Sequence, residues 1–163
     1  KQKFSKIEPE AMYLNHFIHS TFVLSSVQEE QIDFIVKDLN KLFLKKREIV
    51  TKIENWHIFE KDMLTQKNTL CLALQLTEKL VSLQLDLARI LKKFLIPSNI
   101  YPPNLRGVFL ESQKKWGYPF VGEHWFPHIT IGSFGLSKSK INDLLDKEVI
   151  QNKMPIKTLG LYI

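Results

Sequence analysis

Two short apolar segments, each with a histidine and a threonine two residues apart, constrain the fold of this chain more than any other feature. The first, FIHSTFVLS, runs from Phe17 to Ser25, and the second, FPHITIGSF, runs from Phe126 to Phe134. In a β-strand successive side chains alternate between the two faces, so residues two apart share a face. Each segment therefore predicts a strand with one apolar face for packing and one face that presents an imidazole and a hydroxyl.

The polar faces of the two predicted strands carry the same pair of groups. His19 and Thr21 share a face in the first strand, and His128 and Thr130 share a face in the second. If the strands meet, two imidazoles and two hydroxyls converge and can form a phosphate site with an acid and a base. Spacing alone leaves a second interpretation open, in which both are ordinary strand histidines whose neighbouring hydroxyls are satisfied locally.

The two motifs resemble the paired His-x-Thr/Ser motifs of the two-histidine (2H) phosphoesterases. HSTF and HITI carry the resemblance, with the Phe-Pro before His128 and the stretch NTLCLALQLTEKLVSLQLDLARIL, which is similar to that family's strand-then-helix midsection. The family includes bacterial RNA 2′,5′-ligase-like proteins, 2′,3′-cyclic phosphodiesterases and 2′,5′-phosphodiesterases. The resemblance covers about Phe17 to Ile163, and it departs from the family pattern at Ser20, where the family usually has an apolar residue.

The resemblance implies an α+β fold with two lobes related by a pseudo-two-fold axis. In that family antiparallel sheets from both lobes form a central cleft, and the helices lie outside. The residue pattern agrees, because the order motif strand, Ser-capped helix, strand occurs once in each half of the chain. We therefore expect residues 1–163 to form a single 2H phosphoesterase-like domain, with residues 1–14 as a loose arm or a short edge strand.

The other expected elements follow from hydrophobic periodicity and from capping residues. Besides the two motif strands, at residues 15–24 and from about 126, predicted strands lie at residues 48–59, 69–76, 104–110 and 155–163. Predicted helices lie at about residues 26–46, 77–95 and 137–149. Ser26 and Glu29 form a capping box for the first helix, Thr77 caps the second, and Ser137 or Ser139 caps the third. Residues 111–125 are predicted to be a charged and aromatic loop.

Composition limits the class of protein. A chain of 163 residues with 44% hydrophobic and 25% charged residues is typical of one globular domain. No apolar run approaches the roughly 20 residues that span a bilayer, and KQKFSKIEPE at the N-terminus lacks the apolar stretch of a signal peptide. Cys71 is the only cysteine, so an intramolecular disulfide is impossible, and its apolar setting favours a buried thiol over a nucleophile. We expect a cytoplasmic protein that does not contact a membrane.

The charge balance indicates which partners the protein attracts. A net charge of +6 and a pI near 9.3 favour polyanions such as RNA. Part of this charge, however, is a lysine-rich cluster at the end of the first predicted helix, where a solvated helix face explains it equally well. We expect an RNA or nucleotide substrate with a phosphodiester, and a monomeric protein.

The expected reaction is hydrolysis or transfer at a phosphodiester by two-histidine acid/base catalysis, without metal or cofactor. One neutral imidazole, of His19 or His128, accepts a proton from water or a ribose hydroxyl, and the other donates one to the leaving oxygen. The hydroxyls of Thr21 and Thr130 hold the non-bridging oxygens. The sequence does not decide which histidine is the base, or whether the enzyme hydrolyses or ligates.

The remaining histidines are weaker candidates. His16 points away from His19 on an unbroken strand, and His57 is expected to be structural or exposed. His124 precedes His128 by four residues, a spacing that suits a metal on a helix, but Pro127 between them argues against a helix. The chain has no H-E-x-x-H pattern, so we expect no metal site.

Aromatic and basic side chains before the second motif are candidates for substrate contacts. An aromatic ring can stack on a base and a cation can meet a phosphate. These candidates are Arg106, Trp116, Tyr118, Phe120 and Trp125. The other interpretation is that the aromatic residues pack their loop onto the body of the protein.

Two further functional classes remain open beside a 2′,3′-cyclic or 2′,5′-phosphodiesterase. A non-catalytic module would bind a nucleotide or RNA in the same cleft, without turnover. A purely structural basic domain would bind RNA in a salt-sensitive way that does not depend on His19 or His128.

Overall fold

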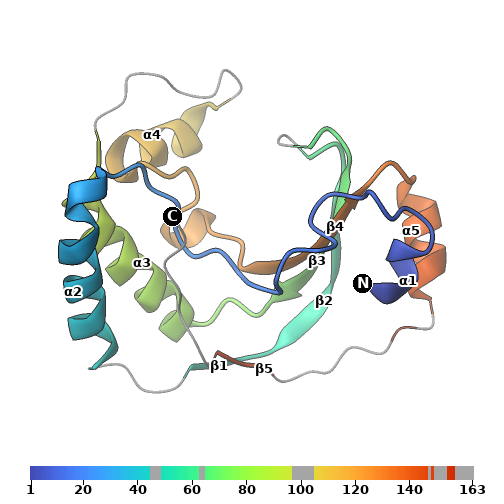
Figure 1. Ribbon diagram of the computed structural model, residues 1–163, viewed down its shortest axis with the longest axis horizontal. Helices are drawn as coiled ribbons and strands as arrows, with labels where there is room; N and C mark the ends of the chain where they lie inside the picture. The colour runs from blue at the N-terminus through green and yellow to red at the C-terminus, as the bar shows by residue number, and fades with distance from the viewer. Residues whose placement is uncertain (45–48, 63–64, 97–104, 147, 149–153, 157–163) are drawn as a thin grey trace. The chain divides into compact units, whose positions relative to one another are not determined.

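Figure 1 shows the computed structural model of the chain, which describes residues 1–44, 49–62, 65–96, 105–146, 148 and 154–156. The chain mixes helices with antiparallel strands, so the predicted α+β class is confirmed. It divides into two compact units, each built from separate stretches of sequence. Of the described residues, unit 1 contains those in 1–21, 52–75 and 127–154, and unit 2 contains those in 22–51, 76–126 and 155–163.

Unit 1 is organised around a three-stranded antiparallel sheet. Its strands are β2 (Ile53–Phe59), β3 (Asn68–Leu74) and β4 (His128–Phe134), in the order β2-β3-β4. Alternating β-branched, aromatic and apolar residues favour strands here, and all three were predicted from the sequence. Strand β4 is the second motif strand, so pairing with β3 holds His128 and Thr130, and the register between the strands shifts directly after Thr130, between Cys71 and Leu70 of β3.

One face of this sheet packs against the N-terminal segment and a C-terminal helix. The core joins Leu70 of β3 and Phe134 of β4 to Phe4 of α1 (Gln2–Ser5) and Ile141 of α5 (Lys138–Leu145). Figure 1 shows α1 and α5 next to each other beside the sheet. The Ser137 hydroxyl accepts a hydrogen bond from Lys140 N at 3.3 Å, which confirms the predicted cap of α5. Residues 147 and 149, in the predicted end of this helix, lie outside the described residues.

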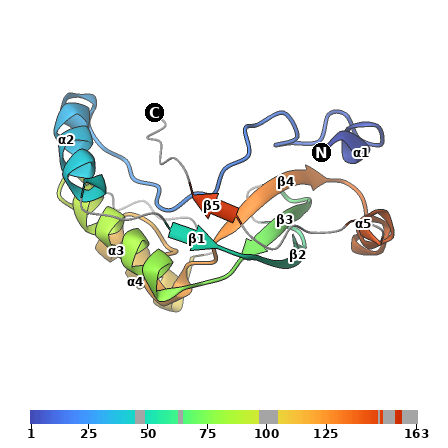
Figure 2. The same ribbon diagram turned by 90° about the horizontal axis from the view of Figure 1, so that it is seen from below.

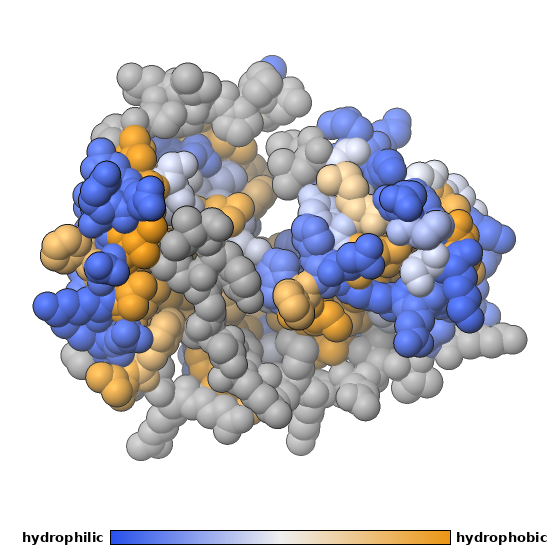
Figure 3. Space-filling view, in the orientation of Figure 1, coloured by the Kyte–Doolittle hydropathy of each residue, from blue (hydrophilic) through white to orange (hydrophobic). Residues whose placement is uncertain are grey.

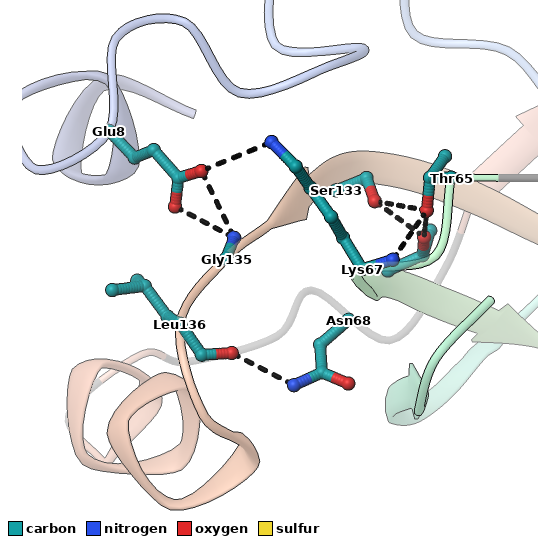
Figure 4. A network of polar contacts seen from close by, with 8 residues as sticks. Glu8, Thr65, Lys67, Asn68, Ser133, Gly135 and Leu136 are labelled. Atoms are coloured by element: carbon teal, nitrogen blue, oxygen red, sulfur yellow. Dashed lines mark hydrogen bonds and ion pairs between the residues drawn. The ribbon is translucent and has the colours of Figure 1, made fainter.

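The first residues of the chain belong to this core rather than to a loose arm. Phe4, Ala11 and Leu14 are buried, and Met12 forms an isolated antiparallel bridge with Ser133 at the end of β4. The carboxylate of Glu8 accepts two 3.0 Å hydrogen bonds from Gly135 N, as Figure 4 shows. Burial and hydrogen bonds therefore hold the N-terminal segment against the rest of unit 1.

Unit 2 is mainly helical. Its helices are α2 (Ile32–Phe43), α3 (Glu78–Lys92) and α4 (Gly107–Trp116), with single 3-10 turns η1 (Glu29–Gln31) and η2 (Gly122–His124). Figure 2 shows α2 and α3 side by side. The Thr77 hydroxyl accepts a hydrogen bond from Leu80 N at 3.3 Å, so the predicted cap of α3 is confirmed. A short strand β1 (Ile49–Thr51) pairs with β5 (Met154–Ile156), which overlaps the predicted closing strand.

The core of unit 2 lies between α3 and its neighbours. Leu80, Leu83 and Leu87 repeat at helical spacing on α3 and pack with Ile49 and Trp125. Apolar residues also reach the surface of α2, where Phe34 and Val36 are exposed. In Figure 3 hydrophobic residues accordingly lie among hydrophilic ones over this helix.

The predicted capping box at the start of the first helix is wrong. The segment begins with η1, and α2 starts only at Ile32; neither Gln28 nor Gln31, the residues before them, forms a side-chain cap hydrogen bond. Ser26 instead uses its backbone carbonyl to accept a 3.0 Å hydrogen bond from Ile96 N. The neighbouring bridge between Val27 and Leu95 holds this stretch extended, which a local capping pattern does not reveal.

The strand predicted at residues 104–110 is also wrong. Residue 104 lies outside the described residues, and helix α4 starts at Gly107 and continues into the predicted loop as far as Trp116. It ends at Trp116 and is followed by Gly117, whose φ of 72° is the left-handed conformation that glycine adopts at little cost. The signals for this helix were the glycine at its end and the basic Lys114 and Lys115 in its last turn.

The strand predicted at residues 15–24 is absent, because residues 17–24 carry no regular secondary structure. Phe17 and Ile18 are 87% and 67% exposed, so the apolar side chains at the start of the motif are not anchored in a core. Alternation predicts a strand only when a neighbouring strand pairs with it. Of the described residues near the motif, Met12 and Val27 form isolated bridges on either side of it.

Candidate functional site

The second motif lies on a strand face that it shares with a third histidine. In the register of the sheet, Ala73 of β3 is the partner of His128, and Cys71 is the partner of Thr130 on β4 and of His57 on β2. Directly opposed residues in an antiparallel sheet point to the same face. His57, His128 and Thr130 therefore share one face, opposite the one that packs on α1 and α5, and all three are half-buried.

A phenyl ring contacts both imidazoles on this face. The ring of Phe59 meets the His57 ring with centroids 4.5 Å apart and the His128 ring with centroids 5.4 Å apart. The interplanar angles of 67° and 69° make both contacts edge-to-face, the geometry that aromatic pairs prefer. His57 and His128 are thereby oriented by the same neighbour.

The electrostatics of the site favour a neutral His57. Burial lowers the pKa of His57, and the positive charges of protonated His128 and of Lys138 lower it further. Burial, followed by the carboxylate of Asp62, raises the pKa of the Cys71 thiol to about 12. Cys71 has no exposed surface and donates to the His57 carbonyl at 3.4 Å, so the thiol is a packing residue and not a nucleophile, as the sequence predicted.

Three hydroxyls form a closed group farther along the same face. Thr69 donates to the Ser133 hydroxyl at 3.0 Å, Ser133 donates to the Thr65 hydroxyl at 2.7 Å, and Thr65 and Thr69 are 3.4 Å apart. Figure 4 shows the Thr65 and Ser133 hydroxyls beside the ion pair of Glu8 with Lys67, whose charged atoms are 3.7 Å apart. These hydrogen bonds join β3 to β4 and so stiffen the scaffold that carries His128.

His19 and Thr21 of the first motif belong to the same unit but not to the sheet, whereas the motif from Phe22 onward belongs to unit 2. His19 is exposed, with Nδ1 at 2.8 Å from the Phe17 carbonyl oxygen, and Thr21 is half-buried. Ser20, the position that departs from the family pattern, has a buried hydroxyl without a hydrogen-bond partner among the described residues. The described contacts bring His128 together with His57; the pairing of His19 with His128 stays a prediction.

The five predicted substrate contacts all lie in unit 2. Arg106 is the exposed N-cap residue of α4. Tyr118 is half-buried, burial raises its pKa to about 12, and its ring packs edge-to-face on Phe120 with centroids 5.6 Å apart. Trp125 is only 4% exposed and packs on Phe22, which leaves little of its ring for a base.

Among the predicted substrate contacts, Trp116 has two lysine ammonium groups beside its ring. It ends α4, and the ammonium groups of Lys92 and Lys115 lie 5.1 and 5.0 Å from its ring centroid. Both distances are within the range of cation–π interactions. Two positive charges at one aromatic ring suit an anionic ligand that also stacks.

The described part of the chain contains no group of three or more metal-ligating side chains. His124 lies in η2, on a separate element from His128, and its ring packs on Phe109 with centroids 5.6 Å apart. Within the same residues, none of the helices has both the length and the apolar content to cross a bilayer.

Sequence reasoning missed His57 and Phe59 as neighbours of His128. Their spacing of two residues in an alternating segment placed both on one face of a strand. What the sequence does not contain is the strand order, which puts β2 and β4 on either side of β3. The sequence does show that the central strand carries two small residues, Cys71 and Ala73. Small residues there allow the longer side chains of the two neighbouring strands to meet on that face of the sheet.

Comparison of the sequence with protein-family models and with curated proteins finds no match. The motifs and the contacts of the described residues are therefore the features that indicate a function.

Proposed function

We propose that the protein is a metal-independent phosphodiesterase that acts on 2′,3′-cyclic or 2′,5′-linked ribonucleotides or RNA ends. The observation that carries the proposal is the placement of His128 and Thr130 on one half-buried face of β4. A half-buried imidazole next to a hydroxyl can exchange a proton with a substrate while the hydroxyl donates to a phosphoryl oxygen. The paired motif at His19 and Thr21, in the same unit, supplies the second imidazole and hydroxyl of the proposed reaction.

In the proposed reaction one imidazole accepts a proton from the attacking hydroxyl or water. The second imidazole, protonated, donates a proton to the oxygen that leaves phosphorus, so the pair ends the reaction with its two protonation states exchanged. Thr21 and Thr130 donate hydrogen bonds to the non-bridging oxygens, where negative charge increases in the transition state. His19 and His128 can each take either role, and the orientation of the substrate decides which is the base.

The resemblance adds further parts to the proposal. It implies two lobes related by a pseudo-two-fold axis, antiparallel sheets around a cleft, and a monomer. The high net charge of +6 supports a nucleotide or RNA substrate, and we propose a cytoplasmic protein. The cations around Trp116 support the same class of ligand, because they pair charge with a stacking surface.

The test is hydrolysis of a small panel without metal. It contains 2′,3′-cyclic nucleotides beside 2′,5′- and 3′,5′-linked dinucleotides, each incubated with the wild-type protein and with the double variant His19→Ala/His128→Ala. Replacement of either histidine alone should lower turnover by about 10²–10⁴, the usual contribution of a positioned acid or base. The His16→Ala variant is the matched control, since His16 is an exposed histidine of the same unit outside both motifs.

Each outcome decides between functional classes. Turnover of one class of substrate that the double variant lacks and the control variant retains supports the phosphodiesterase and identifies the bond. Equal activity in wild type and both single variants contradicts the two-histidine assignment. Binding of a nucleotide without hydrolysis of any phosphodiester favours the binding module instead.

A further inference from the structure

An imidazole outside both motifs lies on the same sheet face as His128. His57 stands in one row with Cys71 and Thr130, and His128 stands in the neighbouring row with Ala73. Cys71 and Ala73, on the middle strand, are small and fully or almost fully buried. Because the side chains of β3 are short here, the longer side chains of β2 and β4 can occupy the space on this face of the sheet. The sheet thus directs two imidazoles and one hydroxyl toward the same region.

Phe59 limits how far apart the two imidazoles can be. Its ring centroid is 4.5 Å from that of His57 and 5.4 Å from that of His128, so the imidazoles are separated by no more than the sum of these distances. Side chains held by a shared aromatic neighbour lose little further freedom when they bind a ligand. Both rings are only half-buried, so a ligand can reach them.

The charges at this face favour an anion between the two rings. A positive charge on His128 lowers the pKa of His57, which means that the two imidazolium forms repel each other. The other charged groups near them are Lys138 of α5, which pairs with Glu60 at 2.6 Å, and Asp62, whose carboxylate acts on Cys71. An anion that contacts both imidazoles removes their repulsion, and it binds more tightly as either becomes protonated.

We propose that His57 and His128 bind one phosphoryl group between them, with the Thr130 hydroxyl as a further donor. His57 is then a substrate-binding residue that neither His-x-Thr motif contains. The inference rests on the proposed function for its ligand class, a phosphate ester of a nucleotide. A neutral imidazole can donate one N–H to a phosphoryl oxygen, and an imidazolium adds a positive charge to that hydrogen bond, so affinity for phosphate rises as the pH falls.

The test follows the imidazole signals of His57, His128 and His16 by nuclear magnetic resonance as the pH is changed. The 163-residue chain is titrated alone, with inorganic phosphate, and with adenosine 2′-monophosphate. A bound anion favours the charged form of a histidine that it contacts, so at a fixed pH the signals of His57 and His128 should both move toward those of the protonated ring. The signals of His16, which packs on Tyr13 outside the sheet, should not respond to either ligand.

A variant measures how much His57 contributes to binding. His57→Gln should weaken binding of adenosine 2′-monophosphate about tenfold, the loss expected for one hydrogen bond to a charged group, whereas His16→Gln should leave it unchanged. If His57→Gln does not fold, the wild-type titration still decides. A His57 signal that does not move while that of His128 does, or no response of either ring, overturns the inference.

The same measurements separate this inference from the proposed function. If both rings respond to phosphate but no phosphodiester is hydrolysed, the shared phosphate site stands and the phosphodiesterase proposal fails. If hydrolysis depends on His128 while His57 shows no response and His57→Gln retains full affinity, the phosphodiesterase stands and the role of His57 is wrong.

Discussion

The side-chain amide of Gln84 donates a 2.9 Å hydrogen bond to the backbone carbonyl of Phe120, from a position on α3 with no exposed surface. The same nitrogen donates to the Phe22 carbonyl at 3.2 Å, and its oxygen accepts from Gly122 N at 2.9 Å. One buried side chain therefore satisfies backbone groups from segments far apart in sequence. Gln84→Ala should lower the free energy of unfolding by about 2–4 kcal/mol, because it removes the partner of three partly buried backbone groups. Urea denaturation measures the loss.

Ser82 gives the matched control on the same helix, because it is exposed. Ser82→Ala should change the free energy of unfolding by less than about 0.5 kcal/mol, as is usual for surface positions. An equal loss in both variants would mean that the effect of Gln84→Ala comes from the helix and not from the hydrogen bonds.

Gly117 follows the end of α4 in the left-handed conformation, with a φ of 72°. A β-carbon at this position would lie 2.3 Å from Cδ1 of Leu95, whose side chain would have to move. Gly117→Ala should therefore destabilise the protein by about 1–2 kcal/mol, from the backbone conformation and the displaced side chain together. The shift of the denaturation midpoint measures it.

Gly107, at the other end of α4, separates the two causes. Its φ is 56°, but a β-carbon there would meet no atom within 4 Å. Gly107→Ala should thus show the backbone cost without the displacement, and a smaller loss of stability than Gly117→Ala. A larger loss at Gly107 would contradict the role assigned to Leu95.

Local signals were enough for part of this fold. The caps at Thr77 and Ser137 were predictable, since a hydroxyl before a helix accepts from a backbone N–H three residues on. Strands β3 and β4 were predictable from their runs of apolar residues, which are buried in the sheet. The segment around Phe17 has the same alternation without the partner strand, and the sequence does not show that difference.

The sequence predicted which residues of the second motif share a face, but it did not predict which side chains contact them. His128 and Thr130 share a face because of a period that any strand imposes. The contact of His128 with Phe59 depends on strand order, which brings β2 and β4 to the same middle strand. Trp125 was proposed as a substrate contact from its place before the motif, but packing against Phe22 makes it part of a core. Composition does not distinguish a ring that packs from a ring that binds.

The Thr69 and Ser133 hydroxyls, 3.0 Å apart, provide a test of buried hydrogen bonding. Ser133→Ala should cost about 1–3 kcal/mol, because the buried Thr69 hydroxyl loses its acceptor and Thr65 loses a donor. Removing both partners leaves fewer unpaired groups. The double variant Thr69→Val/Ser133→Ala should therefore lose less stability than the sum of its single variants, as measured in a double-mutant cycle. Strict additivity would show that the two hydroxyls do not act together.

The buried thiol of Cys71 makes stability depend on pH in the alkaline range. Burial raises its pKa from the ordinary value of 9.0 to about 12 in the folded protein. Between these values the unfolded chain has lost the thiol proton and the folded protein has kept it. The unfolded state then binds fewer protons, so the free energy of unfolding falls as the pH rises above 9, by up to about 1.4 kcal/mol per pH unit from this group.

Cys71→Ala removes this contribution, so its free energy of unfolding should fall less steeply with pH over the same range. Tyr118 adds a second component above pH 10, because burial raises its pKa from 10.0 to about 12. Tyr118→Phe should remove that component while leaving the part below pH 10. Urea denaturation of wild type and both variants from pH 8 to 11 measures these slopes. A wild-type slope equal to that of Cys71→Ala would mean that the thiol ionises as readily in the folded protein as in the unfolded chain.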